Sequence, residues 1–214
     1  MLLGLAEPTR TDEPTLGPGA ALLRGHALAD EAQLLADLAK LAAATSFRHM
    51  FTPGGQRMSV AMSNCGALGW TSGRGGYRYT RQDPETGQPW PAMPDSFLAL
   101  ARRSAARAGY PGFTPDACLI NRYTPGARMT LHQDRNERDM DAPIVSVSLG
   151  LPAVFLFGGD ARTDRPLRVP LAHGDVLVWG GAARLRYHGV LPLAPGQHPQ
   201  LGPWRVNLTF RRAG

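Results

Sequence analysis

The sequence predicts a mainly β protein with flanking helices, built as an antiparallel sandwich or jelly roll. Its 214 residues include 25 glycines and 19 prolines, which favour short strands joined by turns. In the second half of the chain, short apolar runs recur between turn signals such as Pro125-Gly126 and Gly180-Gly181. With 43% apolar residues, a chain of this length can bury one core. We therefore expect a single domain over residues 1–214.

The first element is an N-terminal extension and helix over residues 1–45. Up to about Gly25 the chain is rich in proline and glycine and is expected to be irregular. From Asp30 to Ala44, leucines recur on one helical face, which predicts an amphipathic helix. A second helix is predicted to open at Pro94-Asp95-Ser96 and to stop at Gly109. Both helices are expected to contribute packing rather than chemistry.

The segment between these helices, residues 46–94, is predicted to be mostly loop, with one short strand from Met58 to Ser63. It interleaves basic and aromatic side chains, a mixture that can hold a phosphate backbone and stack on bases. These side chains are Arg48, Arg57, Arg74, Arg78, Arg81, Trp70, Tyr77 and Tyr79. A solvated loop with aromatics packed beneath it explains the same pattern and is slightly favoured on this feature alone.

The rest of the chain is predicted to be strand after strand. Eight short strands are expected, at Ala117–Tyr123, Met129–Asp134, Ile144–Leu149, Val154–Phe157, Leu167–Leu171, Val176–Trp179, Leu185–His188 and Arg205–Phe210. Their even spacing is typical of antiparallel sandwiches and jelly rolls.

The net charge and the cysteines indicate which binding partners and which cellular compartment to expect. The net charge of +6 suits a nucleic acid, but Lys40 is the single lysine, and an arginine-rich composition also arises from codon bias. Cys65 and Cys118 are too few to staple such a domain and are expected to be reduced, buried thiols. No signal peptide is evident, and the most apolar window, Ala142 to Gly159, indicates a strand. We therefore expect a cytoplasmic protein with no membrane partner.

Histidines and aspartates in the second half predict a metal site. Residues two apart in a strand point to the same side, so His132 and Asp134 can reach one ion, and His188 can complete the set. Two imidazoles and one carboxylate leave three octahedral positions open, as non-haem Fe(II) oxygenases require. His173 and Asp175 have the same spacing, but the intervening glycine favours a turn that starts a strand. His132 and Asp134 are therefore the favoured pair.

A polar stripe near the C-terminus points to an anionic ligand. Arg205, Asn207, Thr209 and Arg211 alternate with apolar residues and share one side of the predicted strand. Guanidiniums that face an interior are costly unless they meet anions. A dicarboxylate such as 2-oxoglutarate satisfies two of them through forked hydrogen bonds. A solvated arginine face on an edge strand is the alternative that the pattern leaves open.

Taken together, these segments resemble the AlkB family of Fe(II)- and 2-oxoglutarate-dependent DNA-repair dioxygenases. The resemblance runs from about residue 50 to the end of the chain. It rests on Thr52-Pro53-Gly54-Gly55, Met58 to Met62, Leu68 to Thr71, Trp90 to Pro94, Pro115 to Tyr123, His132-Gln133-Asp134, Pro143 to Pro152, His173 to Val176 and Asn207 to Arg211. It implies a double-stranded β-helix core over residues 115–214 and a nucleotide-recognition lid over residues 46–94.

The resemblance also implies roles for twelve residues. The Fe(II) ligands are His132, Asp134 and His188. The residues around 2-oxoglutarate are Asn121, Tyr123, Arg205, Asn207 and Arg211. The residues at the nucleotide are Trp70, Tyr77, Asn136 and Arg162, with the flipped base stacked between Trp70 and the His132 ring. Flipping is necessary because the alkylated edge of the base lies inside the duplex.

The implied reaction is oxidative dealkylation of N-alkylated bases in DNA, such as 1-methyladenine and 3-methylcytosine. O₂ and 2-oxoglutarate are consumed, and succinate, CO₂ and formaldehyde are released. The same chemistry on RNA or on a protein side chain is an alternative, as is a cupin-like metal-binding module without turnover. A monomer is expected.

One position departs from the family pattern. Bacterial members carry a second acid two residues after the metal-binding aspartate, where it accepts a hydrogen bond from the exocyclic amine of the base. Here that residue is Asn136, and the acidic Glu137 follows it. Asparagine is neutral and both donates and accepts hydrogen bonds. We therefore expect weaker discrimination between cationic and neutral lesions.

Overall fold

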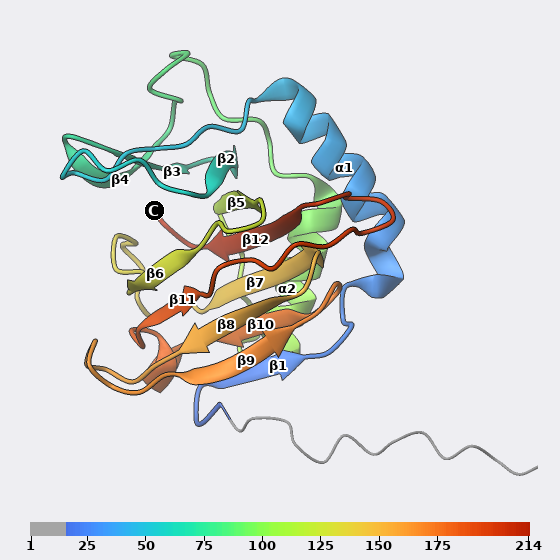
Figure 1. Cartoon of the computed structure of the whole chain (residues 1–214), viewed down its shortest axis with the longest axis vertical. Helices are drawn as coiled ribbons and strands as arrows, with labels where there is room; N and C mark the ends of the chain where they lie inside the picture. The colour runs from blue at the N-terminus through green and yellow to red at the C-terminus, as the bar shows by residue number, and fades with distance from the viewer. Residues whose placement is uncertain (1–15) are drawn as a thin grey trace, which may run out of the picture.

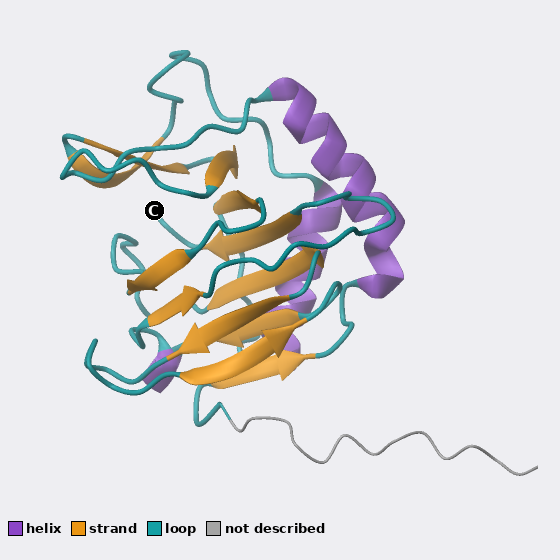
Figure 2. Cartoon of the chain, viewed as in Figure 1, coloured by secondary structure: helices purple, strands orange, loops and turns teal. Residues whose placement is uncertain are grey.

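The computed structural model describes residues 16–214, so the first 15 residues of the predicted N-terminal extension lie outside the described part of the chain. That part folds into two antiparallel sheets, a hairpin and two α-helices (Figures 1 and 2). This is the predicted mainly β architecture with flanking helices. Among the described residues, no helix is both long and apolar enough to cross a membrane.

The strands form one sheet of six, one of four and one of two. In spatial order, the larger sheet consists of β1 (Ala20–Leu23), β10 (Val176–Trp179), β7 (Ile144–Gly150), β12 (Arg205–Arg211), β5 (Ala117–Tyr123) and β2 (Ala61–Gly66). The smaller sheet consists of β6 (Met129–His132), β11 (His188–Val190), β8 (Ala153–Phe157) and β9 (Leu167–Leu171). The hairpin pairs β3 (Gly69–Gly73) with β4 (Gly76–Thr80).

The two main sheets pack face to face and share an apolar layer. Phe155 and Phe157 of the smaller sheet meet Trp179 of the larger sheet, with ring centroids 5.8 and 6.4 Å away. Ile144 from β7 and Val169 from β9 are fully buried in the same layer. Two antiparallel sheets closed over one layer form the predicted jelly-roll core.

Both predicted helices are present and cover the outer face of the larger sheet. In Figure 1, helix α1 (Glu31–Ala44) runs along the right-hand side of the sheets and helix α2 (Asp95–Arg107) lies behind the larger one. Each helix turns an apolar stripe toward the sheet, and Leu34 of α1 is fully buried there. Phe97 of α2 meets Phe210 of β12 edge to face, with centroids 6.0 Å apart. The outer face of the sheet is thus apolar, and the polar residues of β12 lie on its inner face, beside the apolar layer that the two sheets share.

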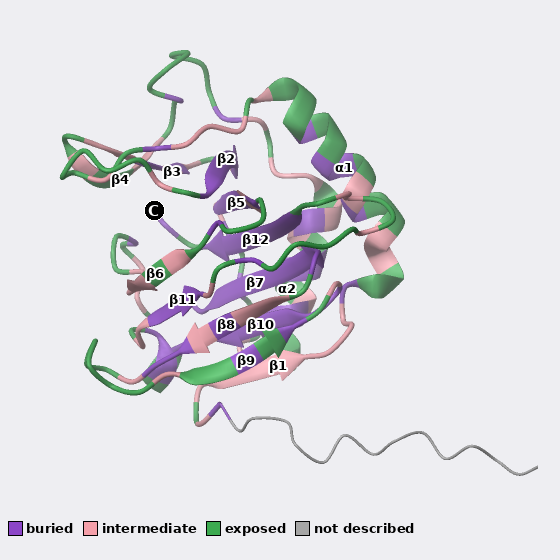
Figure 3. Ribbon diagram, in the orientation of Figure 1, coloured by how far each residue is buried: buried purple, intermediate pink, exposed green. Residues whose placement is uncertain are grey.

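The predicted lid is less separate from the core than expected. Strand β2 lies inside residues 46–94 but pairs with β5 along its whole length at the edge of the larger sheet. In that pairing Cys65 lies directly opposite Cys118, and both are buried free thiols, as predicted. The hairpin and the loop before it are more exposed than the central strands, as Figure 3 shows.

Several local predictions differ from the structure. The segment 46–94 was predicted to hold one strand, at Met58–Ser63, but it holds β2 at Ala61–Gly66 and the β3–β4 hairpin, whose strands pair only with each other. Strand β1 forms where the chain was expected to be irregular, because β10 offers an unpaired edge to this short apolar run. The last-but-one strand begins at His188, and Leu185 before it is exposed and follows a 3-10 turn at Gly181–Ala183. Strand β6 ends at His132, so Asp134 lies in the following loop and not in the strand. The periodicity of a local sequence does not predict which free sheet edge a short strand will pair with, or at which residue a strand ends.

Candidate metal and cosubstrate site

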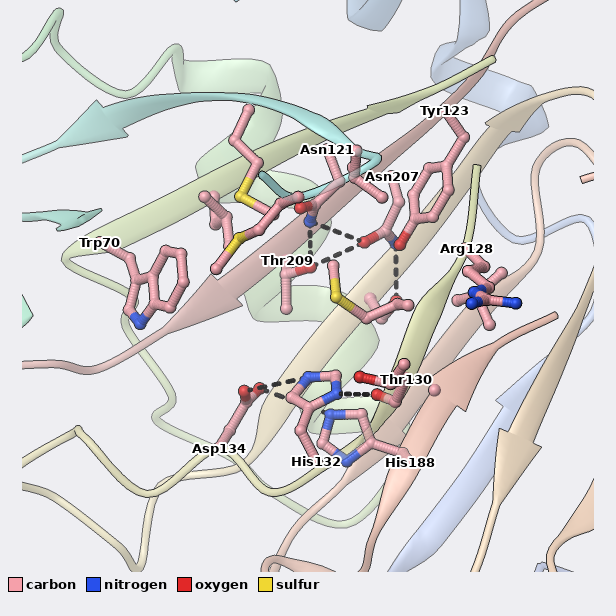
Figure 4. A pocket seen from close by; sticks show the side chains of 18 of the residues that line it. Trp70, Asn121, Tyr123, Arg128, Thr130, His132, Asp134, His188, Asn207 and Thr209 are labelled. Carbon is pink, nitrogen blue, oxygen red and sulfur yellow. Dashed lines mark hydrogen bonds and ion pairs between the residues drawn. The ribbon is translucent and has the colours of Figure 1, made fainter. Parts of the chain in front are cut away.

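A cavity of about 400 Å³ opens between the two sheets beneath the hairpin. Figure 4 looks into it and shows side chains from the larger sheet on one wall and from β6 and β11 on the other. Of the twelve predicted site residues, eleven line this cavity: Trp70, Tyr77, Asn121, Tyr123, His132, Asp134, Asn136, His188, Arg205, Asn207 and Arg211. The twelfth, Arg162, is exposed in the connection between β8 and β9 and is not part of the wall.

Three of these residues form a cluster that fits a metal ion. The ligand atoms of His132, Asp134 and His188 all lie within 4.8 Å of one another. The two histidines come together because β6 and β11 pair in a register that sets His188 opposite His132. Asp134 is brought in by the loop after β6, and its carboxylate oxygens lie 3.7 Å from the Nε2 atom of each imidazole.

Backbone hydrogen bonds orient both imidazoles. The Nδ1 atom of His132 lies 2.8 Å from the carbonyl oxygen of Thr130, and that of His188 lies 3.0 Å from the carbonyl oxygen of Arg186. A carbonyl only accepts, so each Nδ1 carries the proton and donates. Each Nε2 therefore presents its lone pair toward Asp134, as a metal-binding imidazole must.

The surroundings of these groups favour the protonation states in which they can bind a metal ion. Burial lowers the pKa of His188 to about 4, and repulsion from His132 adds to this. Burial alone would raise the pKa of Asp134, but the Arg211 guanidinium and the two imidazoles outweigh it and hold that pKa well below its ordinary value. At neutral pH the cluster thus contains a carboxylate and a neutral buried imidazole.

The two arginines of β12 have different partners. Arg211 donates from Nε and Nη2 to the same carboxylate oxygen of Asp134, at 2.9 and 2.5 Å. Arg205 is 1% exposed and donates from Nη2 to the hydroxyl of Ser148 at 3.1 Å. Its Nε and Nη1 atoms are buried without a hydrogen-bond partner among the described residues. Such donors are costly unless an acceptor binds them, so Arg205 fits a carboxylate ligand.

An amide and hydroxyl network joins Asn121, Asn207 and Thr209 on the wall of the larger sheet, as Figure 4 shows. Asn121 of β5 and Asn207 of β12 are cross-strand neighbours, and their side chains hydrogen-bond at 3.3 Å. Thr209 donates to the Asn207 carbonyl at 2.8 Å, and Asn207 donates to the Ser146 hydroxyl at 2.7 Å. Thr209 was not predicted as a site residue, although its place in the polar stripe of β12 signalled it.

Aromatic residues of the hairpin form the roof. The rings of Trp70 and Tyr77 stack with centroids 5.5 Å apart and planes 17° apart. Tyr77 is 44% exposed and Trp70 is half-buried, so Tyr77 is the more exposed ring of the pair. Asn136 is exposed at the rim of the cavity, in the loop that carries Asp134. Arg128 also lines the cavity and was not predicted, because a single basic residue after a turn carries no pattern.

The competing pair, His173 and Asp175, forms the predicted turn. Asp175 accepts hydrogen bonds from the backbone amides of Gly25 and Ala172, both at 2.9 Å, and pairs with Arg24. His173 accepts a bond from a backbone amide at 2.8 Å, and the glycine between them has φ +84°. Asp175 thus fastens the segment that follows β1, and neither side chain lines the cavity.

Comparisons with known proteins agree with this geometry. Residues 19–211 match the family model described as the 2OG-Fe(II) oxygenase superfamily. The chain is 56% identical to the alpha-ketoglutarate-dependent dioxygenase AlkB of Salmonella typhimurium, over 100% of this chain and 98% of that protein. It is 58% identical to the Escherichia coli protein of the same name, over 98% and 95%. A solved structure titled "The structure of OsALKBH1" superposes with a TM-score of 0.76 at 29% identity, over 92% and 100%.

Proposed function

The chain belongs to the AlkB family of 2-oxoglutarate- and Fe(II)-dependent dioxygenases, and we propose that it removes N-alkyl groups from damaged bases of DNA by oxidation. The observation that carries this proposal is one cavity that holds both a metal-binding triad and a buried, incompletely bonded arginine. A passive metal-binding module has no use for the second feature.

His132, Asp134 and His188 would hold Fe(II). The donor set fits, since two imidazole nitrogens and one carboxylate oxygen converge and leave other coordination positions open. When bound, Fe(II) would supply the oxidising chemistry, with O₂ and 2-oxoglutarate as co-reactants and with succinate, CO₂, formaldehyde and the unmodified base as products. The protein contributes the positions of the reactants and a cavity whose inner end is buried.

Arg205 would bind a carboxylate of 2-oxoglutarate through its unpartnered Nε and Nη1 donors. Tyr123 supports this assignment, because its ring lies 5.9 Å from the Arg205 guanidinium on the same wall. Asn121, Asn207 and Arg211 complete the proposed set around the cosubstrate. Arg211 has a second task there, because it already holds the Asp134 carboxylate.

Trp70 and the His132 ring would stack on the two faces of a flipped base, since both line the cavity below the hairpin. Tyr77 and Arg162 would contact the nucleotide from outside, where both are exposed. Asn136 at the rim would meet the pairing edge of the base. Asparagine offers an amide donor as well as an acceptor there, so neutral lesions should also be accepted.

Mass spectrometry of oligonucleotides tests the proposal. With Fe(II), 2-oxoglutarate and O₂, the wild-type protein should lower the mass of the DNA by about 14 Da, one CH₂, for each 1-methyladenine that it repairs. About one succinate should form for each methyl group removed. The same lesion in RNA and a methylated peptide are the comparison substrates. Succinate formed with RNA alone would move the activity to RNA, and no succinate with any substrate would refute the proposed reaction. That the enzyme is a monomer and is cytoplasmic stays a prediction, and size-exclusion chromatography tests the monomeric state.

A further inference from the structure

A buried acid beside the metal cluster has no part in the proposed chemistry. Glu137 follows Asp134 by three residues and is 6% exposed. One of its carboxylate oxygens accepts a hydrogen bond from the Tyr79 hydroxyl at 2.5 Å, and the other accepts one from Arg184 at 3.0 Å. The Nε atom of Arg211 lies 3.5 Å from the first oxygen. Glu137 thus joins three side chains from three separate parts of the sequence.

Glu137 belongs to a buried group of four charges that is neutral as a whole. Asp134 and Glu137 supply two negative charges, and Arg184 and Arg211 supply two positive ones. Their side chains are 11%, 2%, 4% and 7% exposed, in that order. Buried charges of this kind are stable only with their partners in place. Removal of one contact therefore affects the position of every other member.

The group fixes Asp134 from two directions. Arg211 holds the side chain of Asp134 through two hydrogen bonds to one oxygen. Arg184 holds the same loop by its backbone, because it donates to the Asp134 carbonyl at 2.6 Å. Glu137 touches both guanidiniums and so sets where each of them lies.

The fifth member, Tyr79, belongs to the hairpin that forms the roof. Tyr79 of β4 is the cross-strand partner of Trp70 of β3. Its hydroxyl donates to Glu137, a residue 58 positions later in the sequence. Burial raises the pKa of Tyr79 well above its ordinary value, so the phenol stays protonated and remains a donor. A continuous chain of contacts therefore runs from the strand pair that carries Trp70, through Glu137 and Arg211, to Asp134.

We propose that Tyr79 and Glu137 are positioning residues that couple the base-stacking hairpin to the metal ligand Asp134. This inference rests on the proposed function, since it takes Asp134 as a metal ligand and Trp70 as a base contact. Metal binding orders Asp134 and its guanidinium, which orders Glu137 and draws the hairpin onto the cavity. By thermodynamic linkage, a base under the hairpin strengthens metal binding by the same factor.

Metal affinity measured without turnover tests the coupling. Mn(II), which is redox-stable, is titrated by calorimetry in the presence and absence of a single-stranded oligonucleotide that contains 1-methyladenine. For the wild type, we expect the oligonucleotide to raise Mn(II) affinity at least about fivefold, the lower end of typical coupling between sites. For Tyr79→Phe, which removes only the donor to Glu137, we expect the ratio to fall to nearly one. Glu137→Gln should also reduce it.

Tyr110→Phe is the matched control. Its hydroxyl also donates one hydrogen bond from a partly buried phenol, to the Gly19 carbonyl at 2.8 Å, in the turn before β1. This bond is not part of the contacts that join the hairpin to Asp134. This variant should keep the wild-type ratio. If Tyr79→Phe does too, or if Tyr110→Phe loses the ratio equally, Tyr79 has no positioning role.

A second measurement needs no variant. In wild-type protein, Mn(II) should slow amide hydrogen exchange in residues 69–80, and unchanged exchange there would overturn the coupling. The results distinguish the failure of this inference from the failure of the proposed function. If the wild-type protein repairs the lesion but shows no coupling, the proposed function stands and this inference is refuted. If it neither binds nor repairs the methylated oligonucleotide, both are refuted.

Discussion

Replacement of Arg205 by lysine isolates the geometry of the cosubstrate site from its charge. Arg205 is 1% exposed and has two buried donors without a hydrogen-bond partner among the described residues. Lysine keeps the positive charge but cannot present two parallel donors to a carboxylate. Loss of one hydrogen bond to a charged group costs about 1.5–3 kcal/mol, which corresponds to a roughly 10- to 150-fold weaker interaction.

We therefore expect Arg205→Lys to raise the KM for 2-oxoglutarate by about one to two orders of magnitude. Saturating cosubstrate should restore much of kcat, because the metal triad is untouched. The assay is succinate release at varied 2-oxoglutarate with a fixed methylated oligonucleotide. Arg122→Lys is the control, because Arg122 lies on neighbouring strand β5 with its guanidinium over the rings of Phe47 and Trp204. An unchanged KM in Arg205→Lys would remove Arg205 from the cosubstrate site.

Three further predictions concern the metal, the substrate and the partner. Alanine at any of the three proposed metal ligands should abolish turnover while circular dichroism still reports a folded protein, whereas His173→Ala should stay active; the reverse pattern would mean that the wrong pair was chosen. Asn136→Asp should shift relative kcat/KM toward the cationic lesions 1-methyladenine and 3-methylcytosine, by an amount equivalent to about 1–3 kcal/mol. A shift toward 1-methylguanine or 3-methylthymine would contradict a contact with the base edge. Binding to undamaged DNA should weaken steeply with added salt because arginines displace condensed counterions; a flat response in fluorescence anisotropy would attribute the basic composition to codon bias.

The parts of the fold that the sequence predicts well are those in which one local period continues over a whole element. Strand β12 alternates polar and apolar residues without a break, and all seven of its residues are buried. Strand β5 matches its predicted bounds, Ala117–Tyr123, because it lies inside the larger sheet and opens with the apolar run Ala117–Ile120. Helix α1 follows from the leucine repeat that packs it onto the sheet.

The parts that it predicts poorly depend on contacts between distant segments. Strand β1 is too short to carry a period and exists because β10 has a free edge. Asp134 was predicted from strand geometry, but a loop delivers it and Arg211, 77 residues later, holds it. The bond between Tyr79 and Glu137 joins a hairpin to a loop and leaves no local trace in either. The structure does bring the three predicted ligands together, although part of the geometric reasoning for them was wrong.

The central position of β12 explains why fold and site occupy opposite faces of one sheet. Hydrogen-bonded neighbours on both sides, β7 and β5, satisfy the edges of this strand and fix its register, so its side chains stay divided between the two faces of the sheet. Its apolar side, which includes Phe210, packs against α2 and the rest of the outer core. That packing stabilises the strand enough to hold Arg205 and Arg211 buried on the other side, where charges are costly without anionic partners. The guanidiniums therefore need the ligand and the acids that the cavity brings to them, and the site is a consequence of where β12 lies in the sheet.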